Sequence, residues 1–134
     1  MNEAVLDASV VLKWFHSPGR TASSQHRELR ERFEAGELRV LAPSLLWLEI
    51  LNVAARRWGW TAPQLEQLAA ALPELGFDLI EPELTGIAHW AARGLTAYDA
   101  AYVAIAEQTG AQLVTDHDEI VGTAPELAAA LGTA

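Results

Sequence analysis

Five acidic residues at separate points of the chain are the side chains best suited to chemistry: Asp7, Glu49, Asp99, Asp116 and Asp118. Two carboxylates about 4 Å apart repel each other by about 4 kcal/mol at an effective dielectric constant of about 20. A group of them without a cation would raise its own pKa values or move apart. If the fold gathers these acids, they predict a site for a hard divalent cation, Mg²⁺ or Mn²⁺, which supports hydrolysis.

Each acid also has a structural interpretation that involves no cation. Asp99 stands three residues after a threonine, the spacing of a capping box, and an acid there complements the helix dipole. Asp7 has the residue type of a helix N-cap, and residues 116–118 have the composition of a solvated loop. Glu49 fits this interpretation least, because it lies in an apolar stretch where an unpaired carboxylate is costly to bury. Asn52, one turn further on the same helix face, is its expected hydrogen-bond partner.

Composition limits the class of protein. The 134 residues are 51% hydrophobic, which predicts a single domain over residues 1–134. No stretch of about 18 apolar residues predicts a membrane span and no signal-peptide pattern is present, so we expect a cytoplasmic protein without a membrane partner. There is no cysteine, which excludes disulfides, thiolate metal sites and a cysteine nucleophile. Any metal must therefore be held by oxygen or imidazole.

The net charge of −9 is unevenly distributed. All nine basic residues precede residue 94, whereas residues 94–134 contain six acids and no base. Affinity for nucleic acid comes mostly from lysine and arginine, so this composition predicts a poor nonspecific binder. A polyanionic substrate would need bound cations or the charge of a partner.

Strand and helix patterns alternate along the chain. Strands are predicted over residues 3–7, 38–43, 77–82 and 111–115. Helices are predicted over residues 8–15, 18–36, 45–59, 61–72, 83–94, 97–110 and 124–131, with Ser44, Thr61 and Thr96 as caps. This order is typical of an α/β fold with a parallel sheet.

That fold would bring the acids together. In open parallel sheets the ligand crevice lies beyond the carboxyl ends of the strands, where Asp7 and Asp116 are expected. Glu49 and Asp99 lie near the starts of two predicted helices, and the first turns of such helices meet the same rim. Four carboxylates from distant parts of the chain are therefore expected at one edge of the sheet.

Three segments, VLDASVVLKWF, APSLLWLEILNVAARR and GLTAYDAAYVAIAEQTGAQLVT, resemble the PIN-domain ribonucleases, most closely the VapC-type toxins of toxin–antitoxin pairs. The resemblance covers nearly the whole chain. It implies a PIN-like α/β fold with a small parallel sheet of about four to five strands, and an endoribonuclease that requires Mg²⁺ or Mn²⁺. It also implies a homodimer that is inhibited by a cognate antitoxin protein, through which alone it would reach operator DNA.

By position, Asp7, Glu49 and Asp99 match three acids of the family, with Asp7 and Asp99 as direct metal ligands. Ser9 matches a hydroxyl that holds a ligand or a water, and Asn52 is expected to support Glu49. Thr115 ends the last predicted strand.

The fourth acid departs from the family pattern. The position two residues after Thr115 holds His117 instead of an aspartate, and Asp116 and Asp118 flank it. Side chains alternate along an extended chain, so Asp116 and Asp118 are expected to face the site while His117 faces away. We favour Asp116 as the fourth acid, with Asp118 as an outer ligand through water. His117 as a metal ligand or proton carrier stays open.

The predicted reaction is hydrolysis of an RNA phosphodiester bond. Lys13, Arg56, Arg57 and Arg93 are the candidates for contact with the RNA backbone. Two other interpretations stay open. A non-catalytic PIN-like interaction module is one, and a Mg²⁺-dependent phosphohydrolase is the other, although such enzymes usually place a lysine near the later strands and this chain has none after Lys13.

Overall fold

The sheet is the centre of the molecule. The computed structural model describes residues 2–15 and 24–131. Within them, five strands form one all-parallel sheet in the order β3-β2-β1-β4-β5, as the sequence predicts for a small parallel sheet. The strands are β1 (Asn2–Leu6), β2 (Leu38–Ala42), β3 (Asp78–Leu79), β4 (Gln112–Thr115) and β5 (Ala128–Ala130).

Helices connect every strand to the next. In the described residues they are α1 (Ala8–Phe15), α2 (Ser24–Glu34), α3 (Leu45–Arg56), α4 (Ala62–Ala71), the 3-10 helix η1 (Leu72–Leu75), α5 (Leu84–Ala91), α6 (Ala97–Thr109) and α7 (Asp118–Thr123). The first part of the predicted helix over 18–36 lies outside the described residues. None of the described helices has the length and apolar character needed to cross a lipid bilayer.

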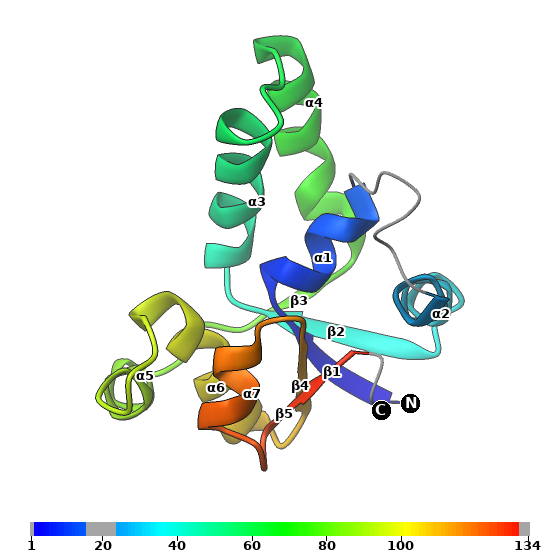
Figure 1. Cartoon of the computed structure of the whole chain (residues 1–134). Helices are drawn as coiled ribbons and strands as arrows, with labels where there is room; N and C mark the ends of the chain where they lie inside the picture. Colours follow the sequence, from blue (N-terminus) through cyan, green and yellow to red (C-terminus); the bar gives the residue numbers. More distant parts are fainter. Residues whose placement is uncertain (1, 16–23, 132–134) are drawn as a thin grey trace.

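The strand order reverses direction at β1. From β1 the chain moves outward through β2 to β3, and it then returns past them to β4 and continues to β5 on the other side. Crossovers between parallel strands are right-handed, so the helices of the two halves cover opposite faces of the sheet. α2 contacts β2 from one face, and α6 contacts β1, β2 and β4 from the other. α3 and α4 pack side by side as an arm that stands away from the sheet (Figure 1).

Side-chain caps mark the starts of two helices. Thr61 and Gln64 form a reciprocal capping box at the start of α4. Thr96 accepts a hydrogen bond from the backbone N–H of Asp99 at 3.0 Å. Both caps agree with the sequence prediction. The predicted cap at Ser44 is wrong, because Ser44 makes no side-chain capping bond and already has helical dihedral angles, whereas a capping residue usually has an extended backbone.

An aromatic cluster joins α1, α2 and α3 to the segment before β3. The ring centroids of Trp14 and Phe33 are 5.8 Å apart, and those of Trp47 and Phe77 are 5.6 Å apart. Both tryptophans pack against the buried core. Their role is therefore packing, as the apolar surroundings in the sequence predict.

The C-terminal segment differs from the prediction. The alanine-rich sequence of residues 124–131 predicts a helix, but the helix α7 lies earlier and Ala128–Ala130 form β5. β5 pairs with β4 in parallel, from Leu113 opposite Ala128 to Thr115 opposite Ala130. The hydrogen-bonding edge that β4 offers outweighs the intrinsic helix propensity of alanine.

Candidate active site

Asp7 lies at the point where the strand order reverses. It directly follows β1, is only 4% exposed, and accepts a hydrogen bond from the Ser9 hydroxyl at 2.6 Å. The hydroxyl of the fully buried Thr115, the last residue of β4, donates to the other carboxylate oxygen of Asp7. Such reversal points are where open parallel sheets bind ligands. The predicted supporting residues Ser9 and Thr115 are thus both in contact with Asp7.

Burial is unfavourable for the charge of Asp7. Burial raises the pKa of the Asp7 carboxyl above its ordinary value, and the negative charge of Asp99 raises it further. The hydrogen bonds from Ser9, Thr115 and the backbone N–H of Val10 oppose this increase in pKa, but they do not cancel it. Asp7 is therefore a carboxylate that a positive charge would stabilise.

Glu49, on α3, is held by a tyrosine. The hydroxyl of Tyr102, which is almost fully buried, donates a hydrogen bond to the carboxylate of Glu49. Burial raises the pKa of Glu49, and repulsion from Asp99 and Asp7 adds to the increase, against the effect of the Tyr102 hydrogen bond. Asn52, the expected partner, is exposed on α3, so the structure gives Glu49 a different donor.

Asp99 lies in the first turn of α6 and has a side chain that is 22% exposed. Its capping contact with Thr96 uses the backbone N–H, so the carboxylate is not engaged by the cap. The charge of Asp99 acts on both Asp7 and Glu49. The three predicted acids are therefore gathered, and capping and a role in the site are compatible for Asp99.

The side chains of Asp116 and His117, directly after β4, point in the opposite directions to those predicted. The carboxylate of Asp116 turns to Lys13 and His26, with Oδ2 at 2.7 Å from Nζ of Lys13 and 2.7 Å from Nε2 of His26. His117 turns towards the acids, with Nδ1 at 3.6 Å from Oδ2 of Asp99. The cause is a sharp turn, because Thr115 accepts the backbone N–H of His117 at 2.9 Å and the chain does not continue as an extended strand.

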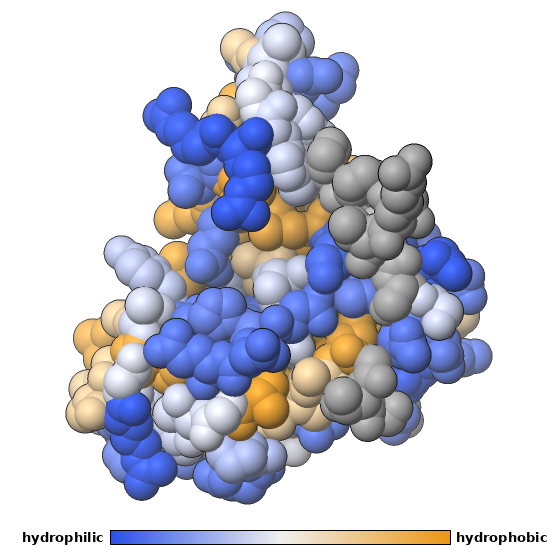
Figure 2. Space-filling model, in the orientation of Figure 1, coloured by the Kyte–Doolittle hydropathy of each residue, from blue (hydrophilic) through white to orange (hydrophobic). Residues whose placement is uncertain are grey.

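Asp118 and the predicted RNA-contact residues lie on the helices that surround the acids or directly after them. Asp118 is on α7, Lys13 is on α1, Arg56 and Arg57 are at the end of α3, and Arg93 follows α5. Asp118 is exposed and opens α7, where an acid complements the helix dipole. Arg56 and Arg57 are exposed at the end of α3, and the Arg93 guanidinium lies 5.1 Å from the ring centre of Trp90. Figure 2 shows hydrophilic residues gathered around the start of α7 and the turn between β4 and α7.

Sequence reasoning missed two residues of this region. Tyr102 stands three residues after Asp99, a helical spacing that places both on one face. The sequence could therefore have indicated that Tyr102 lies near the acids. His26 is 5% exposed although its helix is highly charged, and nothing in the surrounding sequence predicts its contact with Asp116.

The acids are near one another without forming a closed set of ligands. Within residues 2–15 and 24–131, no three histidine, aspartate or glutamate side chains lie close enough to hold one ion as they stand. Lysine and arginine form no ion pair with Asp7, Glu49 or Asp99 in that part of the chain. In the part of the chain that the structure describes, Asp7 and Glu49 therefore have hydroxyl donors, and Asp99 has the imidazole of His117 at 3.6 Å, but no lysine or arginine pairs with any of the three.

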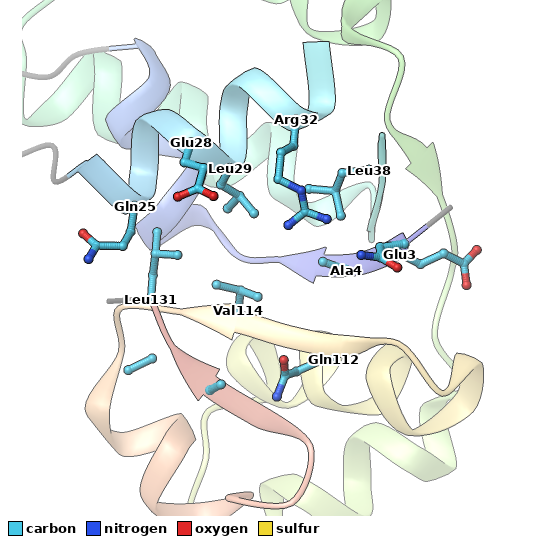
Figure 3. Close-up of a pocket in the computed structure, with 13 residues that line it drawn as sticks. Glu3, Ala4, Gln25, Glu28, Leu29, Arg32, Leu38, Gln112, Val114 and Leu131 are labelled. Carbon is cyan, nitrogen blue, oxygen red and sulfur yellow. The ribbon is translucent and has the colours of Figure 1, made fainter. Parts of the chain in front are cut away.

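A pocket of about 390 Å³ lies away from these acids, between α2 and the strands β1, β4 and β5 (Figure 3). Glu28 and Arg32 line it from α2, and Gln112 and Val114 line it from β4. None of the predicted site residues lines this pocket.

The fold has known counterparts. PAE2754 from Pyrobaculum aerophilum matches with a TM-score of 0.69 and 24% identity, over 98% of this chain and 92% of that one. A toxin–antitoxin complex from Klebsiella pneumoniae matches with a TM-score of 0.62 and 19% identity, over 94% and 95%. VapC20 of Mycobacterium tuberculosis, a toxin that cleaves the sarcin–ricin loop, matches with a TM-score of 0.62 and 15% identity, over 89% and 93%.

A search of curated proteins gave no match. The model of the PIN domain family matches residues 4–124, which include every acid of the site. This match spans most of the chain and includes the end of β1, Asp7 and the whole of β4 with Thr115. The chain belongs to the PIN domain family.

Proposed function

We propose that the chain is a metal-dependent endoribonuclease toxin that hydrolyses RNA and is neutralised by a cognate antitoxin. The observation that carries the proposal is that Asp7, Glu49 and Asp99 act on one another near the reversal of strand order, where burial, and then mutual repulsion, raise the pKa values of Asp7 and Glu49. Family membership and the similarity to VapC20, itself a toxin that cleaves RNA, support this choice of reaction.

The donor set fits a hard divalent cation. Asp7 and Asp99 offer carboxylate oxygens, and Mg²⁺ and Mn²⁺ prefer oxygen ligands. Burial, together with the nearby charge of Asp99, raises the pKa of Asp7, so a positive charge beside it would favour its ionised form. When bound, such a cation would polarise the scissile phosphate and lower the pKa of a coordinated water.

The protein's own residues supply orientation and proton transfer. Ser9 and Thr115 fix both oxygens of Asp7, and so set the direction in which its carboxylate faces. Glu49, with its raised pKa, is the residue that we assign to accept a proton from the attacking water, since a higher pKa makes a carboxylate a stronger base. Tyr102 holds Glu49 in place. Asp116 and Asp118 are outside this assignment, because Asp116 is paired with Lys13 and His26 and Asp118 is exposed.

Contact with RNA and with the antitoxin would use the rim around the acids. Arg56, Arg57 and Arg93 are the proposed phosphate contacts, whereas Lys13 is already paired with Asp116. Leu48 is 66% exposed and Tyr98 is 61% exposed, and they directly precede Glu49 and Asp99 in sequence. These two exposed side chains are the proposed apolar part of the surface that the antitoxin covers. The toxin–antitoxin complex from Klebsiella pneumoniae supports such a partner.

The test is cleavage of total RNA by purified, antitoxin-free protein with Mg²⁺ or Mn²⁺. We expect discrete fragments that disappear with EDTA and in Asp99→Asn, and persist in Asp78→Asn. The control removes the same charge from a residue that pairs with Arg39 at the start of β3. Attack by water with cleavage of the P–O3′ bond leaves a 5′-phosphate and a 3′-hydroxyl on the fragments. Fragments with 2′,3′-cyclic phosphates would show attack by the ribose 2′-hydroxyl and would contradict this mechanism. Intact RNA from a folded protein that binds Mn²⁺ would instead favour a non-catalytic interaction module.

The predicted homodimer and the operator DNA reached through the antitoxin are further parts of the proposal. Sedimentation of the isolated chain and of its complex with the antitoxin would test the dimer. A mobility shift of operator DNA by the toxin–antitoxin complex, and not by the chain alone, would test the binding of operator DNA through the antitoxin.

A further inference from the structure

We propose that His117 donates an imidazole nitrogen to the cation site, and that the site therefore prefers first-row cations such as Mn²⁺ over Mg²⁺. This inference rests on the proposed function, because it concerns the same cation. It assigns the fourth metal ligand to His117, a residue that the alternation of side chains along an extended strand would turn away from the acids.

The first argument is the position of His117. Thr115 is bonded to two parts of the site at once, since its hydroxyl donates to Asp7 and accepts the backbone N–H of His117. This pairing links the backbone N–H of His117 to the Asp7 carboxylate through a single hydroxyl group. The imidazole then extends to Asp99, the other proposed ligand.

The second argument is the distance between the two donor atoms. Nδ1 of His117 lies 3.6 Å from Oδ2 of Asp99, which is too long for a hydrogen bond. Two ligands that each lie about 2.1 Å from one ion, at an angle of about 90° to 120°, are about 3.0–3.6 Å apart. The two atoms are therefore spaced as ligands of one ion would be, and no described hydrogen bond joins them.

The third argument concerns the neighbouring acid. The Asp116 carboxylate is held at 2.7 Å by both Lys13 and His26, so it is neutralised on the α1 and α2 side. Its backbone N–H donates to Ser9 at 2.9 Å, and Ser9 in turn donates to Asp7. Asp116 thus supports the turn through its backbone N–H, which Asp116→Asn retains, and its carboxylate is engaged elsewhere. Of the residues directly after β4, His117 is the one whose side chain faces Asp99.

The preference among cations follows from ligand type. Carboxylate and water ligands suit Mg²⁺ and Mn²⁺ alike, whereas imidazole binds the first-row transition metals better than Mg²⁺. One imidazole in place of a carboxylate should therefore favour Mn²⁺. We expect His117→Asp to lower the ratio of Mn²⁺ to Mg²⁺ affinity by about tenfold, which is the smaller effect seen even when only a residue that supports a metal ligand is changed.

Pulsed EPR of the Mn²⁺-loaded protein, with ¹⁵N-labelled histidine, tests the proposal directly. We expect a nitrogen coupling in the wild type that is lost in His117→Ala and retained in Asp116→Asn and in His89→Ala, which removes an exposed histidine on α5. Thermal unfolding of each variant would confirm that it is folded.

The outcomes separate the two proposals. Mn²⁺ bound without nitrogen coupling would overturn the role of His117 and leave the carboxylate site intact. Loss of coupling in Asp116→Asn, with a folded protein and coupling retained in His117→Ala, would also overturn it. Absence of Mn²⁺ binding in the folded wild type would overturn the proposed metal-dependent function as well.

Discussion

Tyr102 on α6 donates a hydrogen bond to Glu49 on α3 and thereby links two helices that meet at the site. The bond lowers the pKa of Glu49, against burial and the repulsion of Asp99 and Asp7. We predict that Tyr102→Phe raises the pKa of Glu49 and lowers the free energy of unfolding by about 1–2 kcal/mol, because a buried carboxylate loses its donor.

Two measurements check this change. The acid limb of the pH profile for RNA cleavage should move to higher pH, and urea unfolding should show the loss of stability. Tyr98→Phe is the matched control, because the Tyr98 side chain is 61% exposed. Equal behaviour of both variants would contradict the role of Tyr102.

The raised pKa of Asp7 predicts how stability depends on pH. The ordinary pKa is 3.8 and the folded value is higher, so the folded state binds more protons than the unfolded state above pH 3.8. The stability of the wild type should therefore fall as the pH rises from 3.8 through the folded pKa. The side-chain amide of an Asp7→Asn variant does not titrate, so the variant should gain stability relative to the wild type over this window.

Urea unfolding with EDTA, at intervals between about pH 4 and pH 8, would measure this difference. Each unit by which the pKa of Asp7 in the folded state exceeds 3.8 adds about 1.4 kcal/mol to the difference in unfolding free energy between Asp7→Asn and the wild type. A difference that does not change with pH would show that the buried charge of Asp7 is not destabilising.

Cation binding should stabilise the wild type. A cation at one hundred times its dissociation constant adds about 2.7 kcal/mol, which is several degrees of melting temperature in a domain of this size. We expect this increase with Mg²⁺ or Mn²⁺ in the wild type and in Asp78→Ala, but not in Asp7→Ala/Asp99→Ala. Differential scanning calorimetry would measure it, with EDTA to reverse it. An equal increase in all three proteins would place the cation elsewhere.

The two helix starts at Ser44 and Thr61 should respond differently to alanine. Thr61 belongs to a capping box, whereas Ser44 makes no capping bond. Thr61→Ala should cost about 1 kcal/mol of stability and Ser44→Ala close to none. Thermal unfolding of the two variants compares them directly, and equal losses would contradict the assignment of the cap at Thr61.

Much of the fold is predictable because local signals agree with it. Thr96 and Gly110 bound α6 in the sequence as in the structure, where Gly110 has a φ of 79°, in the left-handed region that favours glycine. β5 is not predictable in this way. Alanines favour a helix locally, and only the edge of β4, supplied by the tertiary fold, turns Ala128–Ala130 into a strand.

The site is predictable in part for the same reason. Asp7 and Thr115 follow from the ends of strands that their sequence marks clearly. The orientation of Asp116 and His117 does not, because side-chain alternation holds only while the chain is extended, and the bond from the His117 N–H to Thr115 ends that extension. Such a turn depends on a threonine that is itself fixed by Asp7, 108 residues earlier.

That separation along the chain has a consequence for synthesis. β1 is made well before β4, its neighbour in the sheet, and before the Thr115 hydroxyl that holds Asp7. A nascent or prematurely terminated chain that stops before residue 112 has the Asp7 carboxylate without the strand that fixes it. If the proposed toxin acts as inferred, the ribosomes that make it are exposed to a competent enzyme only after β4 and Thr115 have been synthesised and have paired with β1.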